Sequence, residues 1–215
     1  MKISGAVLAA SGKERRPGAP VALLLHGFGS NAADLASIAP ELAGELWWAS
    51  LQAPLQLSPE SYAWFQILTP GSPDPAAVAE ASAAVWDWVD SQLPSAPPIV
   101  PIGFSQGGLM ATELLRTRPT QVPAAVVLAG FVQSAQRAGD ELLTSERPPV
   151  FWGRGREDGV IAAQAIQRTA DWLPRHARVT ERIYPGLAHG INAVEVAEVR
   201  AFLTEHTDPD GELRR

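Results

Sequence analysis

The sequence predicts an α/β fold in which helices cover both faces of one mainly parallel central sheet. Three observations support this prediction: the length of the chain, the alternation of strand-like and helix-like segments, and the apolar character of the strand segments. The chain has 215 residues, of which 46% are hydrophobic, enough for one sizeable core. Strands that are apolar along their whole length are typical of parallel sheets covered on both faces. We therefore expect a single domain over residues 1–205, followed by a polar tail over 206–215.

The elements follow one another in near-regular alternation. Apolar runs predict strands at 3–10, 20–25, 46–51, 98–103, 124–129, 148–153 and 178–184. Helical patterns lie between them at 32–43, 75–92, 107–117, 160–173 and 192–205. Asn31, Pro75 and Asn192 stand at or near the starts of three of these helices, where such residues are favoured. This alternation indicates parallel strands joined by helical crossovers.

Segment 52–74 is a long, Pro-rich connection without clear periodicity. Connections of this length inside a compact domain are usually functional or disordered. Because this one carries Tyr62, Trp64 and Phe65, we expect it to contribute to a functional site.

Charge and composition exclude several classes of function. The formal net charge is −6, without the basic stripe that a nucleic-acid-binding protein needs. The absence of cysteine excludes disulfides, thiolate catalysis and Cys-ligated zinc. No apolar run approaches the ~20 residues of a membrane span. The first residues faintly imitate a signal peptide, but a first strand explains them equally well, so we expect a cytoplasmic protein.

One serine stands between a predicted core strand and a predicted helix. The run Gly103-Phe104-Ser105-Gln106-Gly107 fits the pattern G-x-S-x-G, which places a nucleophile on a sharp strand-to-helix turn. The helix N-terminus below it supplies backbone N–H groups suited to a developing oxyanion. A Ser/Gly-rich turn with a helix cap is the plainer alternative, but the strand–turn–helix setting favours a nucleophile.

A serine nucleophile needs a base, and the chain has four histidines. We place His206 in the polar tail and His176 in a surface turn. His26 and His189 remain plausible, because each lies in a glycine-bearing loop after a predicted strand. His189 follows Ser105 in the chain and is positioned to act as a base on the hydroxyl.

The acid of a Ser-Asp-His arrangement is expected between the serine and the histidine. Glu157 and Asp158 follow a predicted strand and precede a predicted helix. Either could merely cap that helix, a common use of Asp. Asp140 and Glu141 remain weaker alternatives.

The motifs LLLHGFGSNAADL, IGFSQGG, GREDGVI and AHGI resemble, in order and spacing, the signatures of the phospholipase/carboxylesterase family of α/β-hydrolases, which includes acyl-protein thioesterases. The resemblance covers residues from about 20 to 203. It implies an α/β-hydrolase fold with Ser105 as nucleophile, Asp158 as acid and His189 as base. It also implies an oxyanion hole made by the backbone N–H groups of Phe28 and Gln106.

The resemblance also implies that His26 has a structural role in the oxyanion loop. The segment YAWFQI looks like the family's aromatic segment beside the active site, although Gln66 replaces the acidic residue often found there. Trp64, Phe65, Phe131 and Leu187 are candidates to line an acyl pocket, and each could equally be ordinary core.

The expected reaction is acyl transfer to water through an acyl-enzyme, without metal or organic cofactor, because no metal-ligand spacing such as H-E-x-x-H occurs. We expect short- to medium-chain carboxylic esters as substrates, and thioesters or lysophospholipids as the alternative. A non-catalytic binding module, or an interaction protein with a tryptophan surface, is less favoured. The sequence leaves a homodimer open.

Overall fold

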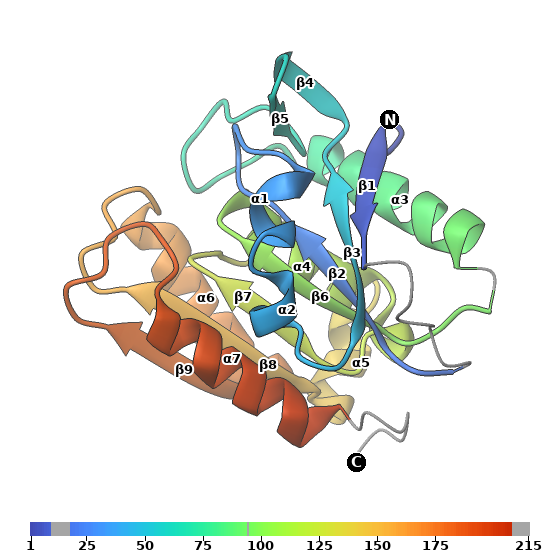
Figure 1. Ribbon diagram of the computed structural model, residues 1–215. Coiled ribbons are helices and arrows are strands. Elements are labelled where there is room, and N and C mark those ends of the chain that lie inside the picture. Colours follow the sequence, from blue (N-terminus) through green and yellow to red (C-terminus); the bar gives the residue numbers. More distant parts are fainter. Residues whose placement is uncertain (10–17, 94, 208–215) are drawn as a thin grey trace.

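The centre of the molecule is a seven-stranded sheet with the order β1-β3-β2-β6-β7-β8-β9. The computed structural model describes residues 1–9, 18–93 and 95–207 (Figure 1). The sheet strands are β1 (Gly5–Leu8), β2 (Val21–Leu25), β3 (Trp47–Gln52), β6 (Ile99–Phe104), β7 (Ala125–Leu128), β8 (Pro149–Gly155) and β9 (Arg178–Tyr184). Strand β1 pairs with β3 in antiparallel fashion, and the other neighbouring pairs are parallel. The predicted mainly parallel sheet is confirmed.

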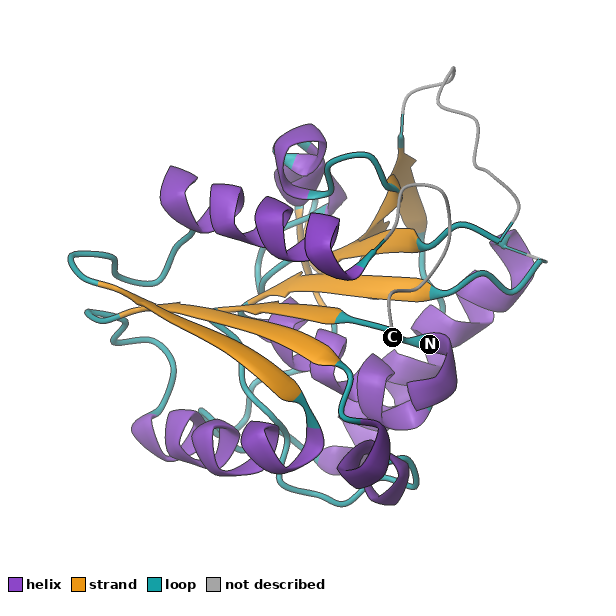
Figure 2. Ribbon diagram, turned by 90° about the horizontal axis from the view of Figure 1, so that it is seen from below, coloured by secondary structure: helices purple, strands orange, loops and turns teal. Residues whose placement is uncertain are grey.

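Helices cover both faces of this sheet, as the edge-on view in Figure 2 shows. They are α1 (Ala32–Ala36), α2 (Ala39–Leu42), α3 (Pro75–Gln92), α4 (Gln106–Thr117), α5 (Asp140–Glu146), α6 (Ala163–His176) and α7 (Ala193–His206). Helices α1, α2 and α7 contribute to the apolar cluster on one face, and α3, α4 and α6 to the cluster on the other. The layered α/β-hydrolase architecture predicted from the sequence is therefore present.

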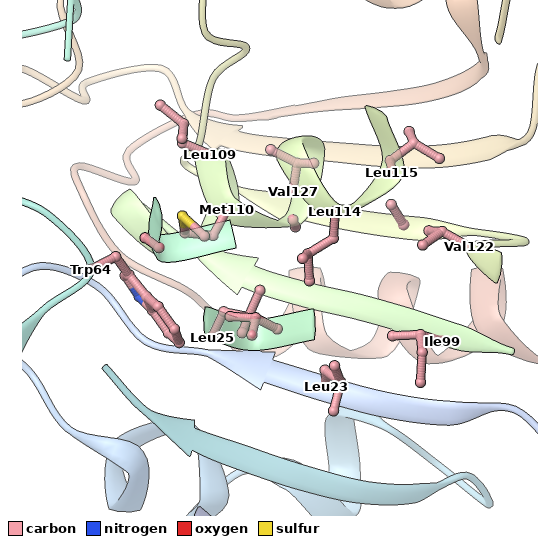
Figure 3. Packing of buried hydrophobic residues seen from close by; sticks show 14 of the residues in the cluster. Leu23, Leu25, Trp64, Ile99, Leu109, Met110, Leu114, Leu115, Val122 and Val127 are labelled. Atoms are coloured by element: carbon pink, nitrogen blue, oxygen red, sulfur yellow. The ribbon is translucent and has the colours of Figure 1, made fainter. Parts of the chain in front are cut away.

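The central strands supply both clusters because successive side chains point to opposite faces of a strand. In β2, Leu23 and Leu25 pack into the cluster with α4, whereas Leu24 packs into the opposite cluster. Figure 3 shows Leu23, Leu25 and Ile99 below the α4 side chains Leu109 and Leu114. These side chains are fully buried, and burial of each contributes about 2 kcal/mol relative to exposure.

The segment predicted as one helix over 32–43 consists of two short helices, α1 and α2. Ser37 ends α1, and its hydroxyl donates to the carbonyl of Asp34. Pro40 stands in the first turn of α2, where its missing N–H costs nothing, whereas inside a continuous helix it would remove a hydrogen bond. The helical pattern was right and its continuity was wrong.

Two further elements lie in segments that the sequence predicted as loops. Segment 52–74 contains a two-stranded hairpin, β4 (Leu55–Ser58) with β5 (Ser61–Ala63), and helix α5 follows β7. The predicted polar tail begins too early, because His206 is the last residue of α7 and Thr207 is buried. The rest of that tail, 208–215, lies outside the described residues, as does residue 10 at the end of the first predicted strand.

Candidate active site

Ser105 occupies the sharp turn between β6 and α4. Its backbone has φ 56° and ψ −115°, a combination that costs a non-glycine residue ~1–3 kcal/mol. Two backbone hydrogen bonds hold this conformation: Ser105 N–H donates to the carbonyl of Leu128 at 2.8 Å, and Leu109 N–H donates to the carbonyl of Ser105 at 3.1 Å. The strain is therefore maintained by the neighbouring strand and by the helix itself.

The two flanking glycines allow the close packing of this turn. A Cβ atom on Gly107 would lie 1.8 Å from the carbonyl oxygen of Leu25, at the end of β2. A Cβ atom on Gly103 would lie 1.9 Å from the carbonyl oxygen of Gly107. Since no real Cβ atom tolerates such distances, only glycine lets α4 begin directly against the ends of β2 and β6.

The structure brings Ser105, His189 and Asp158 into one hydrogen-bonded chain. His189, in the loop between β9 and α7, has its Nε2 atom 2.9 Å from Ser105 Oγ. Its Nδ1 atom lies 2.8 Å from Asp158 Oδ2. The loop that carries His189 packs against Gly155 at the end of β8, where a Cβ would lie 2.1 Å from the carbonyl oxygen of Leu187. Three loops at the carboxyl edge of the sheet thus meet at one point.

The carboxylate of Asp158 is held on both sides. One oxygen faces His189, and the other accepts hydrogen bonds from the N–H groups of Val160 at 2.8 Å and Ile161 at 3.2 Å. Burial raises the pKa of this carboxyl, but the hydrogen bonds from His189, Val160 and Ile161 outweigh burial and leave the pKa below its ordinary value. Asp158 is therefore an ionised acceptor whose orientation is fixed by the backbone.

The other candidate acids lie elsewhere. Glu157 is exposed. Asp140 accepts hydrogen bonds from Arg116 Nε at 2.8 Å and Nη2 at 2.7 Å, away from His189. Glu141 is exposed on α5. Helix α6 begins at Ala163 and not at 160 as predicted, so Asp158 caps the turn that precedes the helix.

The remaining histidines have structural contacts. His176 is in the last turn of α6, stacked on Trp172 with ring centroids 3.9 Å apart, and not in a surface turn. His206 packs edge-on against Phe202 within α7 and not in a tail. His26 is fully buried; its Nδ1 lies 2.7 Å from the carbonyl of Gly27, and its Nε2 accepts from Ala53 N–H at 3.1 Å.

The loop after β2 runs beside the serine. A Cβ atom on Gly27 would lie 3.5 Å from Ser105 Cβ, and Phe28 is the next residue of this loop. This loop is tied to the β4–β5 hairpin, because Gly29 N–H donates to the carbonyl of Tyr62 and Tyr62 N–H donates to the carbonyl of Ser30. Among the described residues, no hydrogen bond engages the N–H groups of Phe28 and Gln106.

The side chain of Gln106 has a role that sequence reasoning missed. Its Oε1 accepts from Trp64 N–H at 2.9 Å, and its Nε2 donates to the carbonyl of Phe65 at 2.7 Å. Gln106 therefore anchors the aromatic segment to the start of α4. Nothing in the local sequence indicated this contact, because its partners lie about 40 residues away.

Trp64 belongs to the core and not to a pocket wall, contrary to the expectation from its loop position. It is fully buried, and its indole N–H donates to the carbonyl of His26 at 2.8 Å. In Figure 3 it lies beside Leu25, at the edge of the apolar cluster. Trp64 thereby supports, from the core side, the loop that contains Phe28.

An apolar pocket of about 190 Å³ opens beside Ser105 and Gln106. Its other walls are residues of the 65–73 loop, residues 160–162 and Phe131. Phe65 and Phe131 are among the residues that line this pocket. Leu187 lies half-buried in the His189 loop, where its carbonyl accepts from Glu157 N–H at 3.0 Å. The acid and histidine loops are joined by that bond.

Comparison with known proteins identifies the family of this chain. The profile of the phospholipase/carboxylesterase family matches residues 9–207. The chain belongs to this family. The family's description names phospholipases and carboxylesterases, which are ester hydrolases, and curated relatives of this chain are named carboxylesterase and acyl-protein thioesterase. The match begins after β1 and covers the six other strands of the sheet and the loops that carry Ser105, Asp158 and His189.

Individual relatives are distant in sequence. An acyl-protein thioesterase 1 of Mycosarcoma maydis is 27% identical over 211 residues, covering 83% of this chain and 88% of the relative. A protein of Oryza sativa subsp. japonica named "probable carboxylesterase" is 26% identical over 66% of this chain, which spans only 58% of that relative. The Bacillus cereus carboxylesterase structure superposes with a TM-score of 0.78 at 22% identity and covers 93% of each chain. It shows the shared fold.

Two other features are absent from the described part of the chain. Residues 1–9, 18–93 and 95–207 contain no group of three or more His, Asp or Glu side chains able to hold a metal ion. None of the helices described here has the length and apolarity to cross a bilayer.

One buried carboxyl behind the histidine loop has a perturbed pKa. Glu195, in the first turn of α7, is fully buried and fills the space that Gly153 leaves on β8, where a Cβ would lie 2.1 Å from Glu195 Oε1. Burial, with a smaller contribution from nearby Glu198, raises the pKa of Glu195 to about 7, although a backbone hydrogen bond from Asn192 opposes the shift.

We expect this group to make the fold less stable as the pH rises. The folded protein binds the proton of the Glu195 carboxyl more tightly than the unfolded chain does, so protonation of Glu195 stabilises the fold. This contribution to the free energy of unfolding is complete below about pH 4.5 and is lost as the pH rises through about 7. Glu195→Gln should remove a pH-dependent component of the free energy of unfolding, of at most about 3 kcal/mol. The measurement is urea unfolding of both proteins at pH 5 and pH 8. Glu205→Gln, an exposed position on the same helix, is the control, and equal pH dependence in all three proteins would contradict the prediction.

Proposed function

We propose that the protein hydrolyses short- to medium-chain carboxylic esters through a covalent acyl-enzyme formed on Ser105. The observation that carries this proposal is the hydrogen-bonded chain from Ser105 through His189 to Asp158 at a strained strand-to-helix turn. A serine hydroxyl becomes an effective nucleophile when an adjacent base accepts its proton and a third group orients that base.

In the first half-reaction, His189 Nε2 accepts the proton of Ser105 as Oγ attacks the ester carbonyl carbon. Asp158 keeps the other ring proton on Nδ1 and stabilises the imidazolium that forms. The N–H groups of Phe28 and Gln106 donate to the oxyanion of the tetrahedral intermediate. The intermediate collapses when the carbon–oxygen bond to the alcohol breaks and His189 gives its proton to the departing alkoxide.

In the second half-reaction, water takes the place of the alcohol. His189 accepts a proton from water as its oxygen attacks the acyl carbonyl, and then returns that proton to Ser105 as the carboxylic acid leaves. Each step uses the same oxyanion donors, so no further acid or base is needed. The proton balance closes within one cycle.

The size of the pocket favours small acyl groups. About 190 Å³ is below the ~300–1,000 Å³ of sites that enclose drug-sized ligands, and its walls are mainly apolar. Thioesters are the second candidate, because the same groups expel a thiolate and the Mycosarcoma maydis relative is named an acyl-protein thioesterase. Lysophospholipids are a third.

The test combines active-site labelling with a substrate panel. A fluorophosphonate probe should label the protein once per chain, at a peptide containing Ser105. Hydrolysis of p-nitrophenyl esters from acetate to laurate should peak at short to medium length and exceed that of matched acyl thioesters. Absence of labelling together with absence of hydrolysis would refute the proposal, and a thioester preference would replace its substrate class.

A further inference from the structure

Three separate chain segments form the walls of the acyl pocket away from Ser105: the 65–73 loop, Phe131 and residues 160–162. One arginine connects all three. Arg168 is on α6, the helix that follows residues 160–162. Its Nε donates to the carbonyl of Val132 at 2.7 Å, and its Nη2 donates to the carbonyl of Gly71 at 2.8 Å. Its Cζ atom lies 5.8 Å from the centre of the Phe131 ring, within cation–π distance.

Within the described residues, this arginine has carbonyl groups and not carboxylates as its hydrogen-bond partners. Among the described residues, no carboxylate lies within ion-pair distance of Arg168. The guanidinium is half-buried and is satisfied by carbonyl groups of two loops far apart in the sequence. A planar guanidinium offers donors from separate nitrogens in a fixed fork, which suits two acceptors on different loops, whereas an ammonium offers all its donors from a single nitrogen.

The Gly71 contact is close as well as hydrogen-bonded. Gly71 has φ +72°, and a Cβ there would lie 2.8 Å from Ala162 Cβ and 3.2 Å from Ala165 Cβ. Glycine therefore lets this loop lie directly on the start of α6. The bond from Arg168 then fixes its carbonyl, so the gap between the 65–73 loop and residues 160–162 has one set width.

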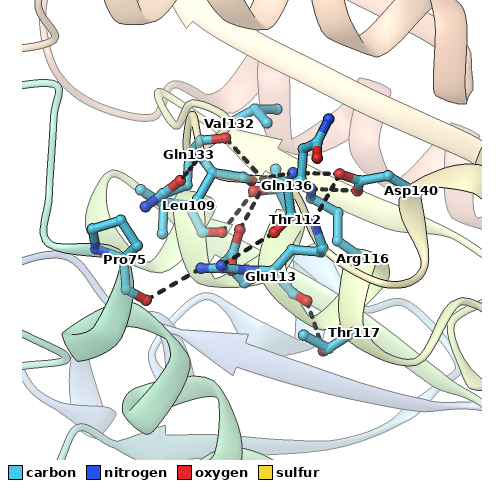
Figure 4. A network of polar contacts seen from close by, with 12 residues as sticks. Pro75, Leu109, Thr112, Glu113, Arg116, Thr117, Val132, Gln133, Gln136 and Asp140 are labelled. Carbon is cyan, nitrogen blue, oxygen red and sulfur yellow. Dashed lines mark hydrogen bonds and ion pairs between the residues drawn. The ribbon is translucent and has the colours of Figure 1, made fainter.

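Hydrogen bonds also fix the side of the pocket that contains Phe131. Thr169, next to Arg168 on α6, accepts a hydrogen bond from Val132 N–H at 2.9 Å, so both polar backbone groups of Val132 are bound by this helix. Arg116 of α4 donates to the carbonyls of Gln133 and Ala135 and to Asp140. Figure 4 shows this network, with Arg116 between Glu113 and Asp140. Because hydrogen bonds fix the loop after β7 at both of its ends, this loop is not a lid.

We infer that Arg168 is a positioning residue that sets the width of the acyl pocket and thereby the acyl chain length that the protein accepts. The inference rests on the proposed function, since the pocket selects acyl groups only if Ser105 is the nucleophile. Arg168 acts through Gly71 and Phe131. Without the two hydrogen bonds of Arg168, the 65–73 loop is free to separate from α6 and from Phe131. The pocket then gains room for longer acyl chains.

The test compares Arg168→Met and Arg168→Lys with Arg175→Met. Arg175 is on the same helix, is exposed, and donates to the carbonyl of Asp171 within that helix, so it is a matched control. We expect Arg168→Met to raise the ratio of kcat/KM for p-nitrophenyl octanoate to that for butyrate by about tenfold, the scale of discrimination that one or two methylenes provide. For p-nitrophenyl butyrate, Arg168→Met should change KM and preserve kcat. Lysine, which reaches one carbonyl, should give an intermediate ratio, and Arg175→Met the wild-type ratio.

A second measurement does not depend on turnover. Hydrogen exchange at the amides of residues 67–72 should be faster in Arg168→Met than in wild type and Arg175→Met, while exchange in β6 should be unchanged. An equal loss of kcat/KM at every chain length, or unchanged exchange in the loop, would overturn the role of Arg168. If the wild-type protein hydrolyses the esters and the Arg168→Met ratio equals the wild-type ratio, only this inference is wrong. If wild type hydrolyses none of them, the proposed function is wrong and the role of Arg168 falls with it.

Discussion

Ser105→Ala is expected to lower kcat for ester hydrolysis by about a million-fold, the scale seen when a triad nucleophile is removed. The reason is that Oγ is the atom that bonds to the acyl carbon, and no neighbouring group takes its place. The Oγ atom makes one hydrogen bond, to His189, and supports no core packing, so the fold should persist. Initial rates with p-nitrophenyl butyrate and unfolding midpoints of both proteins check the two halves of this prediction.

The residual activity of Ser105→Ala is itself informative. A small rate above that of water is expected from the oxyanion donors and from binding alone. Fluorophosphonate labelling should disappear. A variant that keeps a substantial share of wild-type turnover would show that another residue attacks the ester, and the mechanism proposed above would have to be abandoned.

Asp158→Asn is expected to lower kcat by about 10⁴, as removal of the orienting carboxylate does in serine proteases. An asparagine amide can still accept hydrogen bonds from Val160 and Ile161 through its oxygen, and this leaves its NH₂ group facing His189 Nδ1. His189 must then accept at Nδ1 and carry its proton on Nε2, where it cannot take the proton of Ser105. KM should change little, because Asp158 lies behind the histidine.

Two neighbouring acids provide the controls for this prediction. Glu157→Gln alters an exposed side chain one residue earlier and should preserve kcat. Asp140→Asn removes the negative charge that faces the buried Arg116, so its main effect should be on the free energy of unfolding, with a much smaller loss of kcat. If Glu157→Gln proved to be the damaging change and Asp158→Asn were benign, the acid would have been assigned one residue too late.

The nucleophile turn could be predicted from the sequence because its determinants are local. A strand, two glycines and a helix within about 20 residues restrict the backbone at Ser105 to one sharp turn, and the tight contacts at Gly103 and Gly107 are the physical reason for that spacing. The strand and helix alternation could be predicted on the same grounds, since periodicity and apolar runs report burial directly. The order of the helices and strands could be predicted more reliably than the continuity of each helix. Pro40, for example, stands where the predicted helix over 32–43 is divided into α1 and α2.

Contacts between distant segments were decided by the tertiary structure alone. A tryptophan on a long loop has the same local sequence whether it lines a pocket or fills the core. Only the folded structure, in which Trp64 is fully buried and donates to the carbonyl of His26, shows that it is core. Glu157 and Asp158 are adjacent carboxylic acids in the sequence, and only the direction of the backbone turn places one carboxylate on His189. Arg168 reads as an ordinary charged residue of a helix surface. Its two carbonyl partners, 36 and 97 residues away, are brought to it by the packing of α6 against two loops, which no periodicity or motif in the chain encodes.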